Sequence, residues 1–323
     1  MPDTKTVLSY ILSAAIVAII ISLIDPKTVL SSIAKFGLFQ AIIGLVLVFF
    51  SYAIRAKIWQ ALLSPFAKVS LKESYNITTI GFLLNNFLPL RAGEIARAFL
   101  LDRTKSIGKL KIFSTIIVER IVEGISLVAV FVAAMLLNGN RSPELVGLMV
   151  FSGVLFAALL LAFVFSGRTK KILKKLFGFS ALFREKIAQL FDEMLIGGAA
   201  LKSGLKENIA IWGLSGVLWC INFALYFFVA QSLGIQIGFF ELVLVLAVST
   251  LSTIIPSAPG YIGTFEAGFI VSFSAVGLST IDATSMAVVV HILFFAGTTV
   301  LGLFSMNSLK LSVFDLAKIG KKN

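Results

Sequence analysis

The chain has 323 residues, of which 58% are hydrophobic and 14% are charged, and its 28 lysine and arginine residues outnumber 16 acidic residues to give a formal net charge of +12. A soluble protein carries about 25% charged residues, so this chain has too little polar surface to cover a water-soluble body. Its composition excludes soluble enzymes, disordered chains and collagen-like chains, and predicts a protein of the bilayer. The single cysteine excludes an internal disulfide and a cysteine-based metal cluster.

Six regions of the chain are apolar and long enough to cross a bilayer, which takes about 20 residues. In chain order they are 6–24, 36–54, 112–137, 145–165, 209–230 and 284–309. The first resembles the core of a signal peptide. It leads into Asp25 and Pro26 without a small-residue cleavage site, however, so we expect it to remain as a span.

Two further apolar regions are interrupted by proline and glycine. They are residues 72–100, with Pro89 near the centre, and residues 239–277, with Pro256 and Pro259. Proline ends a helix and glycine permits a reversal, and such a break at membrane depth is tolerated inside protein or beside a water-filled cavity. Both regions are predicted to be re-entrant hairpins of two half-helices. The predicted fold is therefore all-α: a polytopic integral membrane protein with about six spanning helices plus two re-entrant helical hairpins.

The basic residues predict the orientation, because lysine and arginine collect on the cytoplasmic side of a membrane. With the N-terminus inside and each hairpin returning to its own side, most of them lie inside. We therefore expect a multi-pass protein of the plasma (inner) membrane with cytoplasmic N- and C-termini. Residues 167–207 are basic and amphipathic, which predicts an interfacial helix. A plain connector that obeys the positive-inside rule is the preferred explanation of its charges, and affinity for anionic headgroups is the alternative.

The domain organisation predicted for residues 1–323 is a single transmembrane domain with an internal repeat. Residues 36–137 read as span, hairpin and span, and residues 208–309 repeat this order, while 138–207 contribute a linking span and the basic amphipathic cytoplasmic loop. Both hairpins share the pattern apolar-Pro-x-x-x-Gly-x-Ile. In the expected topology they enter from opposite sides, which is the inverted repeat of many secondary transporters.

In each hairpin the second half-helix begins near the midplane, so its free N–H groups and positive dipole end attract an anion, phosphate above all. Gly93, Gly260 and Gly263 would let backbone approach such a ligand. Thr264 is the predicted N-cap of the second of these half-helices, with Glu266 in its first turn. The alternative is that these residues only shape the turns.

Ionisable residues also gather at membrane depth, where they pair inside the bundle or line a pathway. They are Arg91, Glu94, Arg97, Glu119, Arg120 and Glu123. The first three are spaced three residues apart, which predicts one side of a helix. Pairing Arg91 or Arg97 with Glu119 or Glu123 would leave an arginine free to bind phosphate. A structural salt-bridge cluster is the alternative.

The only histidine, His291, lies in the middle of a span and is expected to be a helix contact rather than a ligand. The sequence shows no set of residues with metal-ligand spacing, no glycine-rich nucleotide loop and no catalytic serine–histidine pattern. No catalytic residue, metal, cofactor or nucleic-acid partner is therefore predicted. On this basis the protein is not expected to be an enzyme.

Residues 85–99 and 256–267 resemble the flippase-like membrane region of the lysylphosphatidylglycerol synthases, which shows Pro-x-Arg-x-Gly-Glu-x-x-Arg, an intramembrane Glu-Arg pair and a later Pro-Gly-Gly-x-Gly-x-x-Glu. The matching residues are Pro89, Arg91, Gly93, Glu94 and Arg97, then Glu119 and Arg120, then Gly260, Gly263 and Glu266. Ala258-Pro259 precedes Gly260 where the family has a double glycine. Asn85 and Asn86 open the first segment and join the candidate headgroup contacts.

The resemblance covers about residues 36–309 and implies that lipids with polar or phosphate-bearing headgroups cross between leaflets. The aminoacyl-transferase domain of bifunctional relatives is not expected, because the chain ends at Asn323. We therefore expect a flippase- or scramblase-like transporter with membrane lipids as partners. Two alternatives stay open: a membrane enzyme acting on a lipid or polyprenyl phosphate, with Glu94 or Glu119 as base, and a non-catalytic membrane partner of a soluble transferase.

Several properties stay open in the sequence. They are the identity of the lipid, the direction of transport, and whether the partners include a second copy of the chain or a soluble lipid-modifying enzyme. The energy source is also open, because a proton on the Glu119 and Glu123 pair and passive scrambling fit equally well.

Overall fold

The computed structural model describes residues 26–88, 90–138, 204–255 and 257–312, together with scattered positions between 143 and 202. The predicted spans 6–24 and 145–165 and residues 167–203 of the amphipathic loop lie outside the four continuous ranges. Within the described residues every regular element is a helix, which confirms the all-α prediction.

The helices of the two halves follow one another in a similar order. In the first half they are α2 (Pro26–Ile33), α3 (Leu38–Leu63), α4 (Leu71–Phe87), α5 (Ala92–Lys105) and α6 (Lys109–Asn138). In the second half they are α10 (Ala199–Lys202), α11 (Leu205–Leu233), α12 (Phe239–Ser252), the 3-10 helix η1 (Pro259–Tyr261), α13 (Thr264–Ala275) and α14 (Thr280–Ser308).

Among the described residues, four helices are long and apolar enough to cross a membrane, namely α3, α6, α11 and α14. They correspond to four of the six predicted spans. Their outer surfaces carry large apolar side chains: Leu38 is 79% exposed, Phe39 71% and Phe304 70%. A large apolar surface is unfavourable in water and favourable against hydrocarbon, so the fold is that of an integral membrane protein.

Helix α3 is longer than the charge-free run that predicted it. The run ends at Ile54, but the helix continues to Leu63 because Ile58, Trp59 and Leu62 are fully buried. Arg55 therefore lies inside a helix rather than in a cytoplasmic connection. Its guanidinium is accommodated there by an ion pair with Glu123.

The two predicted hairpins are seen as two pairs of short helices, α4 with α5 and α12 with α13, and the helices of each pair pack against one another. In the first break Leu90 and Arg91 both have left-handed backbone, with φ of 57° and 54°. Helix α5 begins only at Ala92. The prediction that Arg91, Glu94 and Arg97 share one helical face is therefore wrong for Arg91, which is the left-handed N-cap of α5 and not a helical residue.

The side chain of Asn85 ties the two helices of the first pair together. Its Oδ1 accepts a hydrogen bond of 2.8 Å from the backbone N–H of Gly93, in the first turn of α5. Asn85 is 4% exposed, so water cannot readily replace this acceptor. It acts as a capping residue supplied from the neighbouring helix.

We expect Asn85→Ala to lower the free energy of unfolding by about 1–3 kcal/mol, because it leaves the buried N–H of Gly93 without an acceptor. Unfolding in mixed detergent micelles, followed by circular dichroism, measures the loss. Asn85→Asp is the control, since it keeps an oxygen at the same place beside a helix N-terminus. Equal losses for the two variants would contradict a capping role.

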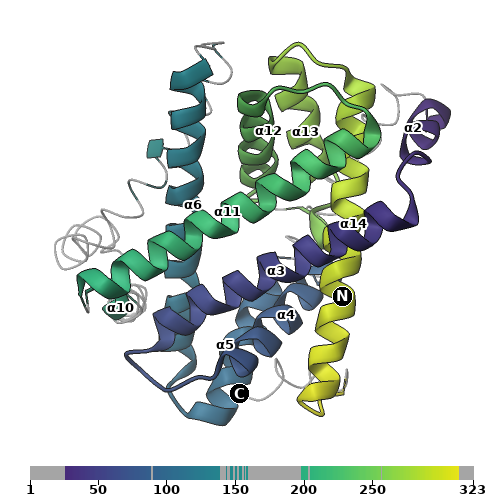
Figure 1. Ribbon diagram of the computed structural model, residues 1–323. Helices are drawn as coiled ribbons and strands as arrows, with labels where there is room; N and C mark the ends of the chain where they lie inside the picture. The colour runs from purple at the N-terminus through teal and green to yellow at the C-terminus, as the bar shows by residue number, and fades with distance from the viewer. Residues whose placement is uncertain are drawn as a thin grey trace, which may run out of the picture.

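The helix contacts of the first half recur in the second. The contacts of α3 with α4, α5 with α6 and α4 with α14 have counterparts in those of α11 with α12, α13 with α14 and α12 with α6. Figure 1 shows α4 and α5 in the lower part of the view and α12 and α13 in the upper part, with α3 and α11 crossing between them. Helices α6 and α14 flank this centre on opposite sides (Figure 1).

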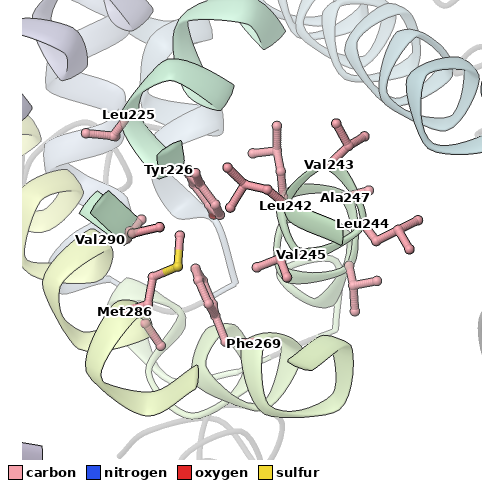
Figure 2. Packing of buried hydrophobic residues seen from close by; sticks show 14 of the residues in the cluster. Leu225, Tyr226, Leu242, Val243, Leu244, Val245, Ala247, Phe269, Met286 and Val290 are labelled. Atoms are coloured by element: carbon pink, nitrogen blue, oxygen red, sulfur yellow. The ribbon is translucent and has the colours of Figure 1, made fainter. Parts of the chain in front are cut away.

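The second pair packs on an apolar core that involves α11 and α14 (Figure 2). The rings of Tyr226 and Phe269 lie side by side with centroids 5.4 Å apart and planes within 18° of parallel. Met286 and Val290 of α14 point toward them, and Val245 of α12 lies on the other side (Figure 2). This packing fixes the second break relative to the long helices.

Candidate functional site

A cavity of 390 Å³ lies where the two breaks approach one another. Its walls come from α3, α4, α5, α6, α11, α12, α13 and α14, and from residues of both breaks. The second break reaches this place because η1 packs against α4. The volume is in the range of small-molecule sites, about 300–1,000 Å³. The charged residues of its wall are Arg55, Arg91, Glu94, Arg120 and Glu123.

Glu123 joins two arginines of this wall. Its Oε2 accepts a hydrogen bond from Nη1 of Arg55 at 2.5 Å and forms an ion pair with Nη1 of Arg120 at 2.9 Å. Both guanidinium groups also lie over the ring of Phe82, at 5.1 Å and 5.6 Å from its centroid. The Nε atoms of Arg55 and Arg120 are buried and have no hydrogen-bond partner among the described residues. Each of the two guanidinium groups therefore has one donor that the described residues leave unsatisfied.

The ion pair of Arg97 and Glu119 lies behind the cavity wall. Nη2 of Arg97 donates to Oε2 of Glu119 over 2.7 Å, and the two side chains are 1% and 0% exposed. The Arg97 guanidinium stacks on Trp59, 4.1 Å from the ring centroid. Nη2 of Arg120 donates to the other oxygen of Glu119 over 2.6 Å. Arg97 therefore ties α5 to α6. It does not line the cavity, whereas Arg120 does.

Arg91 connects the two breaks. Its Nη2 donates to the backbone carbonyl of Thr253 over 2.9 Å, its guanidinium lies 5.5 Å from the Tyr261 ring centroid, and its Nη1 is 3.6 Å from Oε1 of Glu94. The side chain keeps 31% of its surface exposed. A second cavity of 180 Å³ shares Arg91, Thr253 and Gly260 with the first. Arg91 thus lies between two cavities and remains accessible.

Two residues anchor α14 at the cavity. Asn86 of α4 donates from Nδ2 to the carbonyl of Phe295 at 3.1 Å and to Oγ1 of Thr298 at 2.8 Å. His291 lies in hydrogen-bond contact with Glu266 through Nδ1, and its Nε2 is 2.7 Å from the carbonyl oxygen of Gly260. The histidine predicted to be a simple helix contact therefore lines the cavity and contacts the second break.

The start of α13 differs from the prediction. The N-cap is Gly263, not Thr264, because φ is 89° at this position, a value that side chains disfavour. Thr264 is the first helical residue, and its hydroxyl donates to the carbonyl of Tyr261 over 3.1 Å. Glu266 does lie in the first turn, where its Oε2 accepts from the N–H of Gly263 over 2.7 Å. One N–H at the start of α13, that of Gly263, is therefore already bonded within the protein.

Gly93 has a packing role. A Cβ atom at this position would lie 1.8 Å from the carbonyl oxygen of Gly81 and 2.7 Å from Oδ1 of Asn85. Only a residue without a side chain allows α4 and α5 to approach so closely. The glycine thus shapes the pair, as the alternative interpretation of the sequence held.

Some of the predicted site residues meet at the main cavity and others support it. Its wall includes Asn86, Arg91, Glu94, Arg120, Glu123 and Gly260. The supporting residues lie outside that wall and are Asn85, Gly93, Arg97, Glu119, Gly263, Thr264 and Glu266. Of these, Asn85 lines the smaller cavity.

The sequence interpretation missed Arg55 and Tyr261 and undervalued His291. Arg55 follows an apolar run directly, so it was counted with the cytoplasmic charges; the buried apolar residues that follow at helical spacing were the available signal. Tyr261 lies inside the second motif, between Gly260 and Gly263, but its ring had no assigned partner until Arg91 was placed beside it.

The charges of the cavity wall do not cancel. Three guanidinium groups, of Arg55, Arg91 and Arg120, face the two carboxylates of Glu94 and Glu123. The buried pair of Arg97 and Glu119 is balanced. The described wall therefore has one excess positive charge in a region of low dielectric constant, which favours an anionic ligand. No group of residues able to hold a metal ion occurs in the described part of the chain.

The family described as the lysylphosphatidylglycerol synthase TM region matches residues 7–302. The chain is also 27% identical over 286 residues to the UPF0104 membrane protein PH1989 of Pyrococcus horikoshii, an alignment that covers 80% of this chain and 84% of that protein. The family match includes both breaks and every residue of the cavity wall.

Proposed function

The chain belongs to the family of the lysylphosphatidylglycerol synthase transmembrane region, and on that premise we propose that it is a lipid transporter that moves a phosphate-bearing headgroup between the leaflets. The headgroup occupies the cavity between the two breaks, and the acyl or isoprenoid tails stay in the bilayer. The transporter forms no covalent bond with its substrate. The observation that carries this proposal is the excess positive charge of a cavity at the meeting point of two helix breaks.

The chemistry of the wall supports a phosphate rather than a carboxylate or a neutral group. Arginine binds phosphate through a planar fork of donors, and Arg55, Arg91 and Arg120 all reach the cavity. Two of them have a buried Nε without a partner among the described residues. A monoanionic phosphodiester would balance the one excess charge and satisfy these donors.

The architecture supports alternating access. In the proposed arrangement both helix pairs are re-entrant, α4 and α5 from the cytoplasmic side and α12 and α13 from the other side, and both termini are cytoplasmic. Inverted repeats of this kind bind their substrates near the midplane, at the interface between the repeats. Arg91 reaches from one break to the carbonyl of Thr253 in the other, so it lies where a rocking motion would open or close the path.

A leaflet-resolved assay tests the proposal. Purified protein in proteoliposomes is given a trace of fluorescent phosphatidylglycerol, and the fraction accessible to an impermeant quencher is followed in time. Arg91→Gln should slow protein-dependent movement by about tenfold or more, because a hydrogen bond from a charged group is worth about 1.5–3 kcal/mol. Glutamine keeps an amide donor but lacks the charge and the full reach of the guanidinium, so the loss reports the guanidinium group.

Arg103→Gln is the matched control, because it removes the same charge from an exposed position on α5. It should leave the rate unchanged. Fluorescent phosphatidylcholine, whose headgroup has no net charge, should move more slowly than phosphatidylglycerol. Equal rates for wild type and Arg91→Gln, or no protein-dependent movement of any phosphate-bearing lipid, would count against the proposed function.

A further inference from the structure

The ring of His291 is held between two hydrogen-bond acceptors. Nε2 lies 2.7 Å from the backbone carbonyl oxygen of Gly260, and Nδ1 is in hydrogen-bond contact with Oε1 of Glu266. The second carboxylate oxygen of Glu266 is occupied by the N–H of Gly263. The side chains of His291 and Glu266 are 15% and 14% exposed. Both ring nitrogens are therefore committed to protein oxygens.

These contacts determine how many protons the pair holds. A carbonyl oxygen only accepts, so Nε2 of His291 must carry a hydrogen. A neutral imidazole would then present a lone pair from Nδ1 to the Glu266 carboxylate, and the two would repel. The contact requires one more proton, either on Nδ1 or on Glu266. A pair that satisfies both contacts therefore holds one additional proton and has no net charge.

This pair shares the cavity with the charged groups of the headgroup site. On the facing elements these are Arg55, Arg91, Glu94, Arg120 and Glu123. The titratable side chains Tyr52, Tyr226 and Tyr261 also reach the wall. Elsewhere on α14 the acidic residue is Asp282, in the first turn, and α2, which packs against α14, contributes the exposed Lys27.

The charge of the cavity depends on this proton. With the pair of His291 and Glu266 protonated and neutral, the wall keeps its one excess positive charge. Loss of the proton gives the pair a charge of −1, and the site becomes neutral overall. An anionic headgroup is therefore bound more tightly when the proton is present, and by linkage the headgroup strengthens binding of the proton.

Resting on the proposed function, we propose that His291 and Glu266 form the site of a coupling proton that crosses together with the anionic headgroup. One proton carried with one monoanionic headgroup is an electroneutral load. The proton site is also linked to the backbone of the second break, because His291 contacts the carbonyl oxygen of Gly260. After deprotonation one ring nitrogen of His291 presents a lone pair to either the Gly260 carbonyl oxygen or the Glu266 carboxylate. The repulsion weakens the contact between His291 and the second break.

The first test reads the proton site without any transport. His291 is the only histidine of the chain, so protein with ¹⁵N-labelled histidine in lipid nanodiscs gives one imidazole signal. We expect Nε2 to be protonated at pH 7, with the additional proton on Nδ1 or, by infrared difference against Glu266→Gln, on the Glu266 carboxyl. A ring with Nε2 unprotonated, or a pair without the additional proton, overturns the site.

The second test imposes a pH difference of two units across proteoliposomes that contain trace fluorescent phosphatidylglycerol. One coupled proton should shift the distribution of the lipid about tenfold for each pH unit, toward the alkaline side. In His291→Gln the amide can still donate to Gly260 but cannot titrate, so the distribution of the lipid that this variant moves, at whatever rate, should be the same with and without the pH difference. Glu266→Gln is the second variant and should behave in the same way.

The outcomes separate the two proposals. A wild type that moves lipid but ignores the pH difference overturns proton coupling and leaves the proposed function standing. Variants that still follow the pH difference as the wild type does place the coupling proton elsewhere and overturn this site. Absence of any lipid movement in the wild type overturns the proposed function and the coupling with it, while the histidine spectrum decides the proton site independently.

Discussion

Replacing Glu119 with leucine should lower the free energy of unfolding by about 3–5 kcal/mol. This is more than the loss expected from removing an exposed charge. The substitution leaves Arg97, which is 1% exposed and enclosed by Trp59, without its carboxylate partner. It also removes one of the two acceptors of Arg120. An unpaired charge buried in this way has neither water nor counter-ion, and breaking one side of a buried pair therefore costs more than the pair contributes.

The measurement is reversible unfolding in mixed micelles with an increasing fraction of a denaturing detergent. Glu73→Leu is the matched control, because Glu73 also pairs with a basic residue, Lys105, at 3.1 Å, but at 19% and 27% side-chain exposure. More exposed pairs contribute about 1 kcal/mol or less. Similar losses for the two variants would show that Arg97 is not held as the structure describes.

Gly93→Ala is the second substitution with a large expected effect. It should lower the free energy of unfolding by about 3 kcal/mol, at the upper end of the range for overpacking. The new Cβ would lie 1.8 Å from the carbonyl oxygen of Gly81. Backbone stands on both sides of this contact, so no side chain can rotate to relieve it, and α4 and α5 must separate. Because these helices position Asn86 and Arg91, lipid movement should fall together with stability.

The control for this substitution is a glycine-to-alanine change that should raise the free energy of unfolding instead of lowering it. Gly216 lies in α11, where a Cβ would meet nothing within 4 Å. Gly216→Ala should therefore stabilise the protein by about 0.5–1 kcal/mol, because alanine loses less conformational freedom than glycine in a helix. The same unfolding experiment measures both variants. A neutral Gly93→Ala would contradict the close approach of α4 and α5.

The sequence predicts the fold class and four of the spans well because hydropathy over about 20 residues is a strong local signal. The interruptions of helix at residues 88–91 and 253–263 were also predicted, because proline and glycine act on the backbone directly. The end of α3 was missed because the prediction used only the length of the apolar run. A charge such as Arg55 ends an apolar run, but a buried carboxylate on another helix allows the helix to continue.

The site was predictable only in part, because hydrogen-bond partners are set by tertiary packing. Asn86, Arg91, Glu94, Arg120 and Glu123 were all chosen as candidates and do line the cavity. Spacing alone did not reveal which arginine faces a ligand and which is enclosed by protein. The role of His291 was hidden for a similar reason, since its partners lie 25 and 31 residues away along the chain.

The backbone of the first break stores energy. Leu90 and Arg91 are both left-handed, and each such residue costs about 1–2 kcal/mol relative to a relaxed conformation. The contact between Arg91 and the carbonyl of Thr253 helps to hold this segment in place. A phosphate that draws the guanidinium away from Thr253 would therefore remove a contact with the second repeat that holds the strained backbone at Leu90 and Arg91, and that backbone could then relax. Ligand capture and opening of the path would then be one event.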